Sequence, residues 1–513
     1  MIFTDLPPEI LLKVITLLEL GDVARIRQSC KQLRDITQDK FIWVSLLKNQ
    51  RWNHPIPPWF DFYESLAAPA NPSTVELEHA VVTTHRIARA WPCPRSPPLK
   101  AHPRLGDMLF MLEMYLDRWL LVIYAEGLVY LWDTQANPMT PPGRLGTTSR
   151  ARICAKLMDE DKDRQGRWTS CAAQVTEDGQ KLVVLLNLKA PPALCRVYEV
   201  ALKPDASFKL LMTVRLSTPE IIRSISFSDN MLILSRGSAI NLVDIAKKPR
   251  RDLLVLSPYS EDLEDMWNGT IEIRVFNRYL FAFKARSIEV HDMDHLLETT
   301  HREFTAIPFA KHFFHNMTFR DVRISTPIIS FDPCLEIKFQ VFSYDVLQGL
   351  FDFGICLQIR PEDPPVFTVA LLNIYALANH VASQFSRILT GPDLLTPSPT
   401  PTNEMRSPFR QTNLSSRGFL SAYALGPRAK RAVWVERIRG STLREIQVWN
   451  DSSTPEDEQI VDGPPGEIER VAVYTISSPD LREDVIRCAL SESMGLIVLG
   501  NRAGEIFLLD LDA

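Results

Sequence analysis

Residues 6–18 read LPPEILLKVITLL, which is the pattern of an amphipathic helix entered through two prolines. Its apolar side chains recur at helical spacing and form one wide stripe. The stripe comprises Ile10, Leu11, Val14, Ile15 and Leu18. Pro7 and Pro8 suit the entry into the first turn, where the helix dipole also favours Glu9. We expect Gly21 to end this helix and Asp22 to cap the next one.

Residues 1–50 as a whole predict a compact three-helix unit with a surplus of apolar helix surface. Ile26, Cys30 and Leu33 carry the apolar faces of the second and third helices. A unit of about fifty residues buries too small a share of its surface to be stable alone. Contiguous exposed apolar patches usually mark interaction sites, so we expect a partner polypeptide to cover this surplus. An ordinary helical cap on a larger domain is the alternative.

The order and spacing of these residues resemble the F-box, the module that docks substrate receptors onto the Skp adaptor of cullin-type ubiquitin ligases. The resemblance covers about the first tenth of the chain and includes a Leu-Pro start, the apolar stripe, Asp22, the run Cys-Lys-x-Leu-Arg at 30–34, and Trp43. The chain departs from the family at residues 24–27, which are unusually basic, and at Leu33, where many members carry a second Trp. The resemblance implies adaptor contact, or support of that contact, for Leu6, Pro7, Ile10, Leu11, Ile15, Leu18, Cys30, Leu33 and Trp43.

Length and composition limit the class of protein. The 513 residues suggest two to four domains, and a net charge of −5 gives no electrostatic argument for nucleic acid. No signal peptide or membrane-spanning stretch is evident, and the eight cysteines include no Cys-x-x-Cys pair. We therefore expect a cytoplasmic or nuclear protein that is not secreted and binds no membrane. The basic run at 247–251 could be a nuclear localisation signal or a solvated loop.

Residues 51–100 read as a linker. The part at 51–73 is rich in proline and aromatic residues, and 74–91 has a helical pattern that Pro92 and Pro94 end. A helix at this place would set the distance and orientation between the F-box and whatever follows it.

From about residue 105 onward, the apolar pattern changes to period two. A short apolar run, a turn and an alternating run that ends in Asp or Asn recur along the chain, which predicts the inner hairpin of a propeller blade. The alternating runs lie at 127–133, 238–244, 286–292, 444–450 and 504–510, with weaker copies at 195–199 and 339–342. The ending Leu-Trp-Asp at 131–133 resembles a WD-repeat blade, although the Gly-His dipeptides of that family are absent.

The sequence therefore predicts an α+β multidomain chain. It consists of a three-helix F-box at 1–50, a Pro- and aromatic-rich and helical linker at 51–100, and an all-β, propeller-like domain of about seven blades at 101–513. Residues 391–417 are rich in Pro, Ser and Thr and are expected to form a disordered loop. Residues 350–377 could add strands or an eighth blade. A pair of β-sandwiches is the alternative fold.

No catalytic constellation is apparent. Asp159, Asp161 and Asp163 begin like a calcium loop, but Arg164 stands where glycine is needed, so an exposed acidic loop is favoured. The histidines at 291, 295, 301, 312 and 315 lack zinc spacing and are interpreted as ordinary loop residues. Trp132, Trp434 and Trp449 lie on expected strands and are interpreted as core residues. We expect no cofactor and no metal.

The resemblance to the F-box implies a non-catalytic substrate-recognition subunit of a cullin-type ubiquitin ligase, that is, of an SCF complex. Its partners would be a Skp-type adaptor, through it a cullin, and an unknown protein substrate. Arg236, Arg286 and Arg502 lie near expected turns and are candidates for reading a phosphate, but one sequence gives no sign that they converge, so the substrate-binding residues stay unknown. An adaptor-binding scaffold outside ubiquitination is the alternative, and an enzyme on the propeller is the third possibility.

Overall fold

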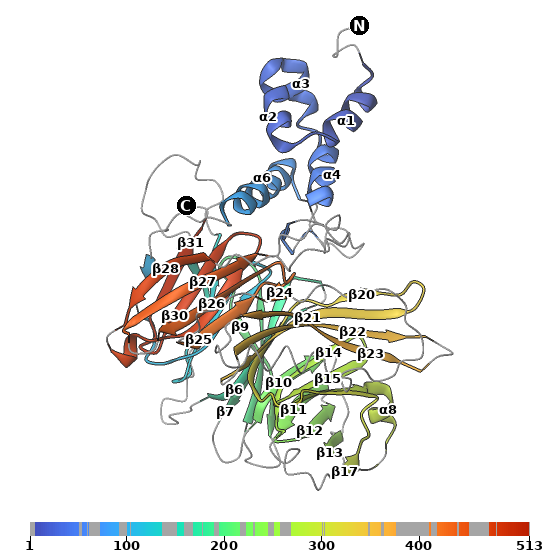
Figure 1. Ribbon diagram of the computed structural model, residues 1–513, viewed down its shortest axis with the longest axis vertical. Coiled ribbons are helices and arrows are strands. Elements are labelled where there is room, and N and C mark those ends of the chain that lie inside the picture. The colour runs from blue at the N-terminus through green and yellow to red at the C-terminus, as the bar shows by residue number, and fades with distance from the viewer. Residues whose placement is uncertain are drawn as a thin grey trace.

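The computed structural model of the protein describes most of the chain, with gaps. The described residues are 6–50, 54–58, 60, 72–91, 100–102, 104–135, 151–157, 168–176, 178–188, 194–215, 222–228, 231–244, 251–256, 268–299, 301, 303–346, 349–360, 364–375, 410–411, 418–438, 441–450, 471–478 and 480–511. A helical unit lies at one end, and helix α6 lies between it and a ring of β-sheets (Figure 1). No helix within these ranges is long and apolar enough to cross a membrane.

The helical unit contains four helices among the described residues, one more than the sequence indicates. They are α1 (Pro8–Thr16), α2 (Leu20–Ser29), α3 (Lys31–Ile36) and α4 (Lys40–Gln50). Cys30 adopts an extended conformation between α2 and α3, so the faces of Ile26 and Leu33 belong to separate helices. The expectation that Gly21 ends the first helix and Asp22 caps the second is wrong. Helix α2 begins at Leu20, which packs against the core of the unit, and this packing outweighs the low helix propensity of glycine.

The expected linker helix is confirmed as α6 (Thr74–Ala90). Ser73 caps its N-terminus in a reciprocal arrangement with Glu76: the Glu76 N–H donates to Ser73 Oγ, and the Ser73 N–H donates to the Glu76 carboxylate. Two otherwise unsatisfied backbone donors are paired in this way. The beginning of the helix is therefore fixed by its own sequence.

The β region forms seven sheets within the described ranges, which confirms the expected seven-bladed propeller. Sheet I contains β2 (Leu109–Tyr115), β3 (Trp119–Tyr124), β4 (Val129–Asp133) and β5 (Arg152–Leu157), and sheet II contains β6 (Trp168–Val175), β7 (Lys181–Leu188), β8 (Leu194–Ala201) and β9 (Phe208–Arg215). Sheet III contains β10 (Ile222–Ser228), β11 (Met231–Arg236), β12 (Ala239–Asp244), β13 (Arg251–Leu256) and β17 (Glu303–Thr305). Sheet IV contains β14 (Thr270–Phe276), β15 (Tyr279–Lys284), β16 (Ser287–Asp292) and β18 (Ala310–Phe313). Helix α8 (Met293–Glu298) follows β16.

Sheets V to VII complete the ring. Sheet V contains β19 (Phe319–Ile324), β21 (Leu335–Asp345), β22 (Gly349–Ile359), β23 (Val366–Tyr375) and β24 (Arg410–Gln411), with β20 (Ile328–Ser330) paired to β21. Sheet VI contains β25 (Gly418–Leu425), β26 (Arg431–Ile438), β27 (Leu443–Asn450) and β28 (Val471–Ser477). Sheet VII contains β29 (Val485–Ser491), β30 (Leu496–Asn501), β31 (Ile506–Asp510) and β1 (Lys100–His102). The short helix η3 (Leu481–Glu483) precedes β29.

The ring is closed by a strand from its other end. β1, which precedes sheet I in the chain, pairs antiparallel with β31 and becomes the outermost strand of sheet VII. The first strand of every sheet contacts the first strands of the sheets beside it, and the series returns from β29 to β2. Closure of this kind leaves only short, protected sheet edges.

The core of the ring is divided among the interfaces between sheets. Seven clusters of buried apolar side chains each join two neighbouring sheets. Within β15, for example, Leu280 packs toward sheet III and Phe281 toward sheet V. Successive side chains of a strand point to opposite faces, so the middle strands are buried on both sides. The three tryptophans expected in the core, Trp132, Trp434 and Trp449, are buried there.

The recurring hairpin has a different place in the blade from the one expected. The five aligned runs form β4, β12, β16, β27 and β31, which are third strands, and the preceding runs form second strands. The repeat is thus the middle hairpin of each sheet and not its inner hairpin. The first strands lie innermost, and their polar residues interrupt the apolar pattern that would have identified them. Residues 350–377 supply β22 and β23 of sheet V rather than an eighth blade.

Several expectations fall outside the described residues. The acidic loop with Asp159, Asp161 and Asp163 is one, and the basic run at 247–251 is another except for Arg251, which begins β13. The expected disordered loop at 391–417 is a third, except for Arg410–Gln411, which form β24 and pair in parallel with β23.

Candidate functional site: an exposed apolar face on the helical unit

Helix α1 divides its apolar side chains between two faces. Leu11 and Ile15, four residues apart, are completely buried. Ile10 remains 44 % exposed and Leu17, seven residues further on, 84 % exposed. Residues separated by seven positions lie on one side of a helix. Leu17 is the C-cap of α1 and keeps helical backbone angles, so it extends the side that carries Ile10.

Helix α4 contributes a third large apolar side chain. Phe41 is 54 % exposed, although its neighbours Ile42 and Trp43 are buried. The start of α4 is held by Asp39, whose carboxylate accepts the Phe41 N–H at 2.8 Å. Helices α1 and α4 pack against each other. We refer to Ile10, Leu17 and Phe41 together as the exposed helical face.

The buried side chains of the unit pack against the chain's own linker helix. One cluster joins Ile15 and Val23 to Trp43 of α4 and to Leu77 and Val81 of α6. Trp43 also donates its indole N–H to the Thr37 carbonyl at 2.9 Å. The four-helix unit therefore completes its core with α6, and this packing does not extend to the exposed helical face.

An ion pair ties the same two parts together. The Arg27 guanidinium donates to both carboxylate oxygens of Glu78 on α6, the second at 3.1 Å, and also to the Thr37 carbonyl at 3.1 Å. Its Cζ lies 5.2 Å from the centre of the Trp43 ring. Bidentate geometry of this kind fixes orientation as well as distance. The unusually basic stretch at 24–27 thus has a structural use, since Arg27 orients α6.

The other end of α6 is packed into the propeller. Ile87 and Trp91 are buried in the cluster between sheets VI and VII. The Trp91 indole N–H donates to the Trp449 carbonyl at 3.0 Å. Ile87 approaches Gly495 so closely that a Cβ there would lie 3.0 Å from its Cγ2, and Gly495 has a φ of +64°. Glycine meets both the steric and the conformational demand at this position.

Buried charges surround this contact. Glu492, between β29 and β30, accepts the backbone N–H groups of Arg428, Lys430 and Arg431 in the corresponding turn of sheet VI. Asp117, in the corresponding turn of sheet I, accepts those of Glu492 and Ser493. Burial, and then the nearby Asp117, raise the pKa of Glu492 to about 7. Burial lowers the pKa of Arg431, whose guanidinium lies 4.9 Å above the Trp91 ring, to about 10.

Charged side chains also line the inner strands of the ring. Arg323 of β19 lies 3.5 Å from Glu113 of β2 and 3.3 Å from Asp321, and Arg274 lies 3.3 Å from Glu272 on β14. No sequence pattern points to these residues, because the inner strands carry no apolar repeat. Arg236 ends β11, and Arg286 and Arg502 lie in the turns after β15 and β30, so all three lie where a second strand leads to a third one, on one face of the ring. Their role in substrate binding stays a prediction.

The structure divides the nine residues predicted for adaptor contact into two groups. Pro7, Ile10 and Cys30 are exposed, and Leu6 and Leu18 are half-buried. The remaining four are buried at 6 % exposure or less, which fits the supporting role among the two that were predicted: Leu11, Ile15, Leu33 and Trp43. Leu17 and Phe41 were missed, although the seven-residue spacing from Ile10 points to Leu17.

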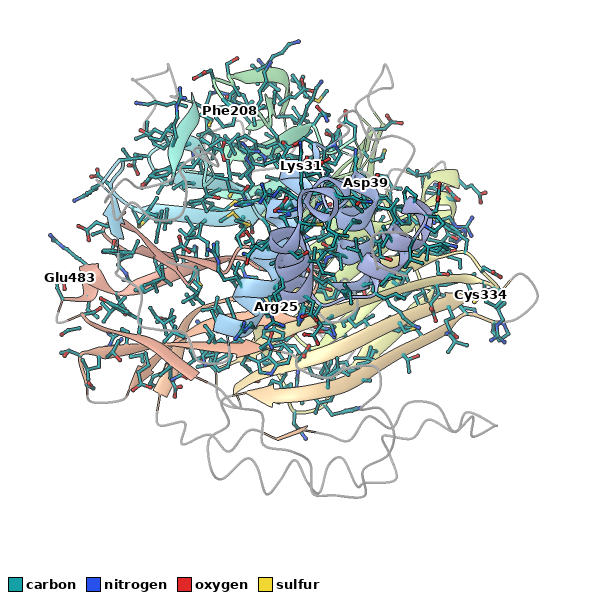
Figure 2. The ribbon with its side chains drawn as sticks, turned by 90° about the horizontal axis from the view of Figure 1, so that it is seen from above. Arg25, Lys31, Asp39, Phe208, Cys334 and Glu483 are labelled. Atoms are coloured by element: carbon teal, nitrogen blue, oxygen red, sulfur yellow. The ribbon has the colours of Figure 1, made fainter. Side chains whose placement is uncertain are left out.

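Viewed from the side of the helical unit, Arg25, Lys31 and Asp39 project over the sheets, and Cys334 lies near the rim beside the long hairpin of β21 and β22 (Figure 2).

No group of three or more His, Cys, Asp or Glu side chains able to hold a metal occurs in the described ranges. Burial, and then His315, lower the pKa of His312 to about 4.

Comparison with known proteins identifies the helical unit. A family model described as F-box-like matches residues 3–49, so the chain carries an F-box-like domain there, followed by the seven-bladed propeller. No curated protein gives a significant match to this sequence.

Three solved structures illustrate the likeness of the β region. The Cps50 (Swd1) β-propeller domain of Myceliophteria thermophila has 12 % identity and a TM-score of 0.46, covering 80 % of this chain and 99 % of that one. The WD40 domain of SCAP from fission yeast has 8 % identity and a TM-score of 0.38, covering 79 % and 85 %. KlHsv2 with loop 6CD replaced by a Gly-Ser linker has 9 % identity and a TM-score of 0.39, covering 77 % and 90 %. The propeller assignment rests on the strand pairing and the seven inter-sheet clusters.

Proposed function

We propose that this F-box-like and propeller chain is a non-catalytic substrate-recognition subunit of a cullin-type ubiquitin ligase. In this proposal the exposed helical face binds a Skp-type adaptor, and the propeller binds a protein substrate. The observation that carries the proposal is the exposure of Ile10, Leu17 and Phe41 in a domain of the F-box type whose other side is packed on α6.

Physical chemistry favours a protein partner for this face. Large apolar side chains exposed on a small helical domain are costly in water, and exposed apolar surface on such a domain can mark an interaction site. The Leu17 side chain is 84 % exposed, so it contributes little to the apolar core of the chain. Burial of the Leu17 side chain would be favourable, and it requires another molecule that supplies an apolar surface.

Helix α6 supports a receptor role because it fixes the geometry between the two binding regions. Its first half belongs to the core of the helical unit and its last turn to the core of the propeller. A ligase accelerates transfer by holding a substrate lysine near a charged conjugating enzyme, and the effective concentration depends on reach and stiffness. A helix anchored in both cores would keep that reach constant.

The test is a binding assay between a purified Skp-type adaptor and the full chain carrying Ile10→Asp and Leu17→Asp. We expect the affinity to fall by at least about tenfold, because charges would enter the centre of an apolar interface. Val75→Asp is the matched control: Val75 is 72 % exposed, but it lies on α6 outside the face. Circular dichroism should show that all variants remain folded. Undiminished adaptor binding by the double variant would overturn the proposal.

Substitution of Leu11 gives no clean test, because this side chain is completely buried. Leu11→Asp would place a charge in the core and unfold the domain, so loss of the adaptor would follow for either reason. Co-purification of a cullin with the intact chain separates the proposed receptor from the alternative, an adaptor-binding scaffold that acts outside ubiquitination.

A further inference from the structure

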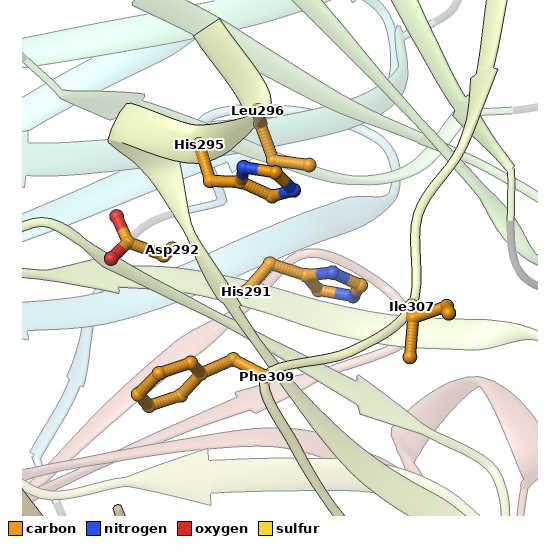
Figure 3. A pocket seen from close by; sticks show the side chains of 6 residues that line it. All are labelled: His291, Asp292, His295, Leu296, Ile307 and Phe309. Atoms are coloured by element: carbon orange, nitrogen blue, oxygen red, sulfur yellow. The ribbon is translucent and has the colours of Figure 1, made fainter. Parts of the chain in front are cut away.

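The ion pairs of this chain differ in how far apart the elements are that they join. Figure 3 shows a pocket of about 250 Å³ between β16, α8 and the segment before β18, with Asp292 among its lining residues. The Asp292 carboxylate binds Arg278 at 3.3 Å and accepts the Asp294 N–H at 3.0 Å, so these contacts stay within sheet IV and the helix that follows β16. The pair of Arg27 and Glu78, in contrast, joins the helical unit to the helix that enters the propeller.

Arg27 is oriented by contacts within the helical unit. Its Nε donates to the Thr37 hydroxyl at 3.0 Å, and one terminal nitrogen donates to the Thr37 carbonyl at 3.1 Å. Its Cζ lies 5.2 Å from the centre of the Trp43 ring, a distance at which an aromatic face attracts a cation. Thr37 and Trp43 are both buried, so they provide a fixed support for the guanidinium. The end of α3 and the first turn of α4 therefore set the direction in which this side chain of α2 points.

The same guanidinium presents two parallel donors to α6. One terminal nitrogen donates to Oε1 of Glu78 and the other to Oε2, the latter at 3.1 Å. The two side chains are 27 % and 31 % exposed, so water still reaches the pair. A pair at this exposure contributes little to stability by itself. Its bidentate geometry, however, restricts the angle between donor and acceptor as well as their distance. Orientation is therefore the property that this contact can control.

The apolar contact between α4 and α6 holds the two helices together but does not define their angle as sharply. Leu77 and Val81 share a buried cluster with Trp43. Hydrophobic burial is non-directional, so a small rotation of α6 on this cluster costs little. Glu78 lies 13 residues before Trp91, the residue of α6's far end that is buried in the propeller. At the helical rise this separation is about 20 Å, so a tilt of about 20° at Glu78 would move the far end by about 7 Å.

We propose that Arg27 is a positioning residue: its bidentate contact with Glu78 fixes the angle at which α6, and with it the propeller, leaves the helical unit. The functional part of this inference rests on the proposed function, since the angle matters for ubiquitin transfer only if the helical unit binds an adaptor. In an assembled ligase the angle decides which lysines come near the charged conjugating enzyme. Loss of the pair widens the range of orientations and leaves adaptor binding intact, because Arg27 is not part of the exposed helical face.

The first test measures the orientation directly, by double electron–electron resonance on the full chain. Spin labels carried by non-natural amino acids at positions 31 and 328 avoid the native cysteines, and both Lys31 and Ile328 are exposed. The unmodified chain should give a narrow distance distribution. Arg27→Ala and Glu78→Ala should each widen it by at least about twofold, since a tilt at this joint is amplified along α6. An unchanged width in both variants would overturn the proposal.

Three further variants separate positioning from a general loss of structure. Arg25→Ala is the matched control, because Arg25 lies on the same helix, is 82 % exposed and pairs with Asp22 of that helix, so the width should not change. The double variant of Arg27 and Glu78 should widen the distribution no further than either single one, since both remove one contact. Arg27→Lys keeps the charge but loses the planar fork, so it should resemble Arg27→Ala. Additive widening, or a narrow distribution with lysine, would contradict the proposal.

Ubiquitin transfer tests the functional part separately. The chain is assembled with a Skp-type adaptor, a cullin and a charged conjugating enzyme, and its own lysines serve as acceptors that mass spectrometry maps. The unmodified chain should be modified at a small set of lysines, and Glu78→Ala should spread ubiquitin over more of them at unchanged adaptor affinity. An identical pattern in both chains would overturn the positioning role. Absence of adaptor binding by the unmodified chain would instead overturn the proposed function, and the spin-label distances would still decide whether Arg27 fixes the angle.

Discussion

The propeller and the helical unit bury apolar surface in contrasting ways. Each of the seven sheets shares a cluster with both of its neighbours, and β1 pairs with β31 so that no sheet is left at an end. The helical unit has one cluster, which needs Leu77 and Val81 of α6 to be complete and still leaves Leu17 in water. A closed ring satisfies its own apolar surface, whereas a small bundle depends on what is attached to it. The difference supports the proposal that the adaptor-binding surface lies on the bundle, and α6 is the element that both regions share.

The largest expected effect concerns the place where the two regions meet. Trp91→Ala should destabilise the chain by about 3–5 kcal/mol, because it empties a site between sheets VI and VII and leaves the Trp449 carbonyl without its donor. Urea unfolding measures this loss. Small-angle X-ray scattering should show the helical unit released from the ring as an increased radius of gyration. Val75→Ala on the same helix should change stability by less than about 0.5 kcal/mol. A loss below about 1 kcal/mol for Trp91→Ala would mean that α6 does not depend on this anchor.

The next effect compares the two faces of one helix. Leu11→Ala should cost about 2–5 kcal/mol in the unfolding of the helical unit, since Leu11 is fully buried. Leu17→Ala removes the same atoms from an 84 % exposed position and should cost less than about 0.5 kcal/mol. Hydrogen exchange at the amides of α1 to α4 reports the local stability. Similar losses for both variants would show that Leu17 is covered by the chain itself and would remove the basis for a partner.

The smallest expected effect is the pH dependence of the junction. Glu492 has a pKa raised from 4.5 to about 7 in the folded protein, so the folded state holds more protons than the unfolded state between these values. The associated stability is therefore complete below pH 4.5 and is lost as the pH rises to about 7, by an amount of the order of 1–3 kcal/mol. Urea midpoints from pH 5 to pH 8 should fall accordingly.

Glu492→Gln should flatten this pH profile, because the amide does not titrate. It should also lower stability at every pH, since an amide nitrogen would face one of the three backbone N–H groups that the carboxylate now accepts. A midpoint that still declines in the variant would assign the pH dependence to another group, with Asp117 as the first to examine.

Sequence patterns identified those parts of the molecule in which local spacing and tertiary burial agree. Five of the seven third strands in the described ranges carry a run of alternating residues that ends in Asp or Asn, so these five align by sequence alone. The inner strands gave no such signal, because residues such as Glu113 and Arg323 interrupt their apolar pattern. For residues 350–377, the prediction of added strands is confirmed and that of an eighth blade is not, since β22 and β23 belong to sheet V, whose β21 and β22 run for eleven residues each.

For the candidate site, the sequence determined the apolar stripe and the presence of a surplus, since helical periodicity depends only on neighbours along the chain. It could not assign Ile10 to solvent and Leu11 to the core, because that choice depends on where α4 and α6 approach α1. Tertiary structure alone decided that Arg27 binds Glu78, that Trp91 enters the propeller, and that His291 meets His295, Ile307 and Phe309 around one pocket. These contacts join residues from different elements, and no local rule of spacing fixes their distance in space.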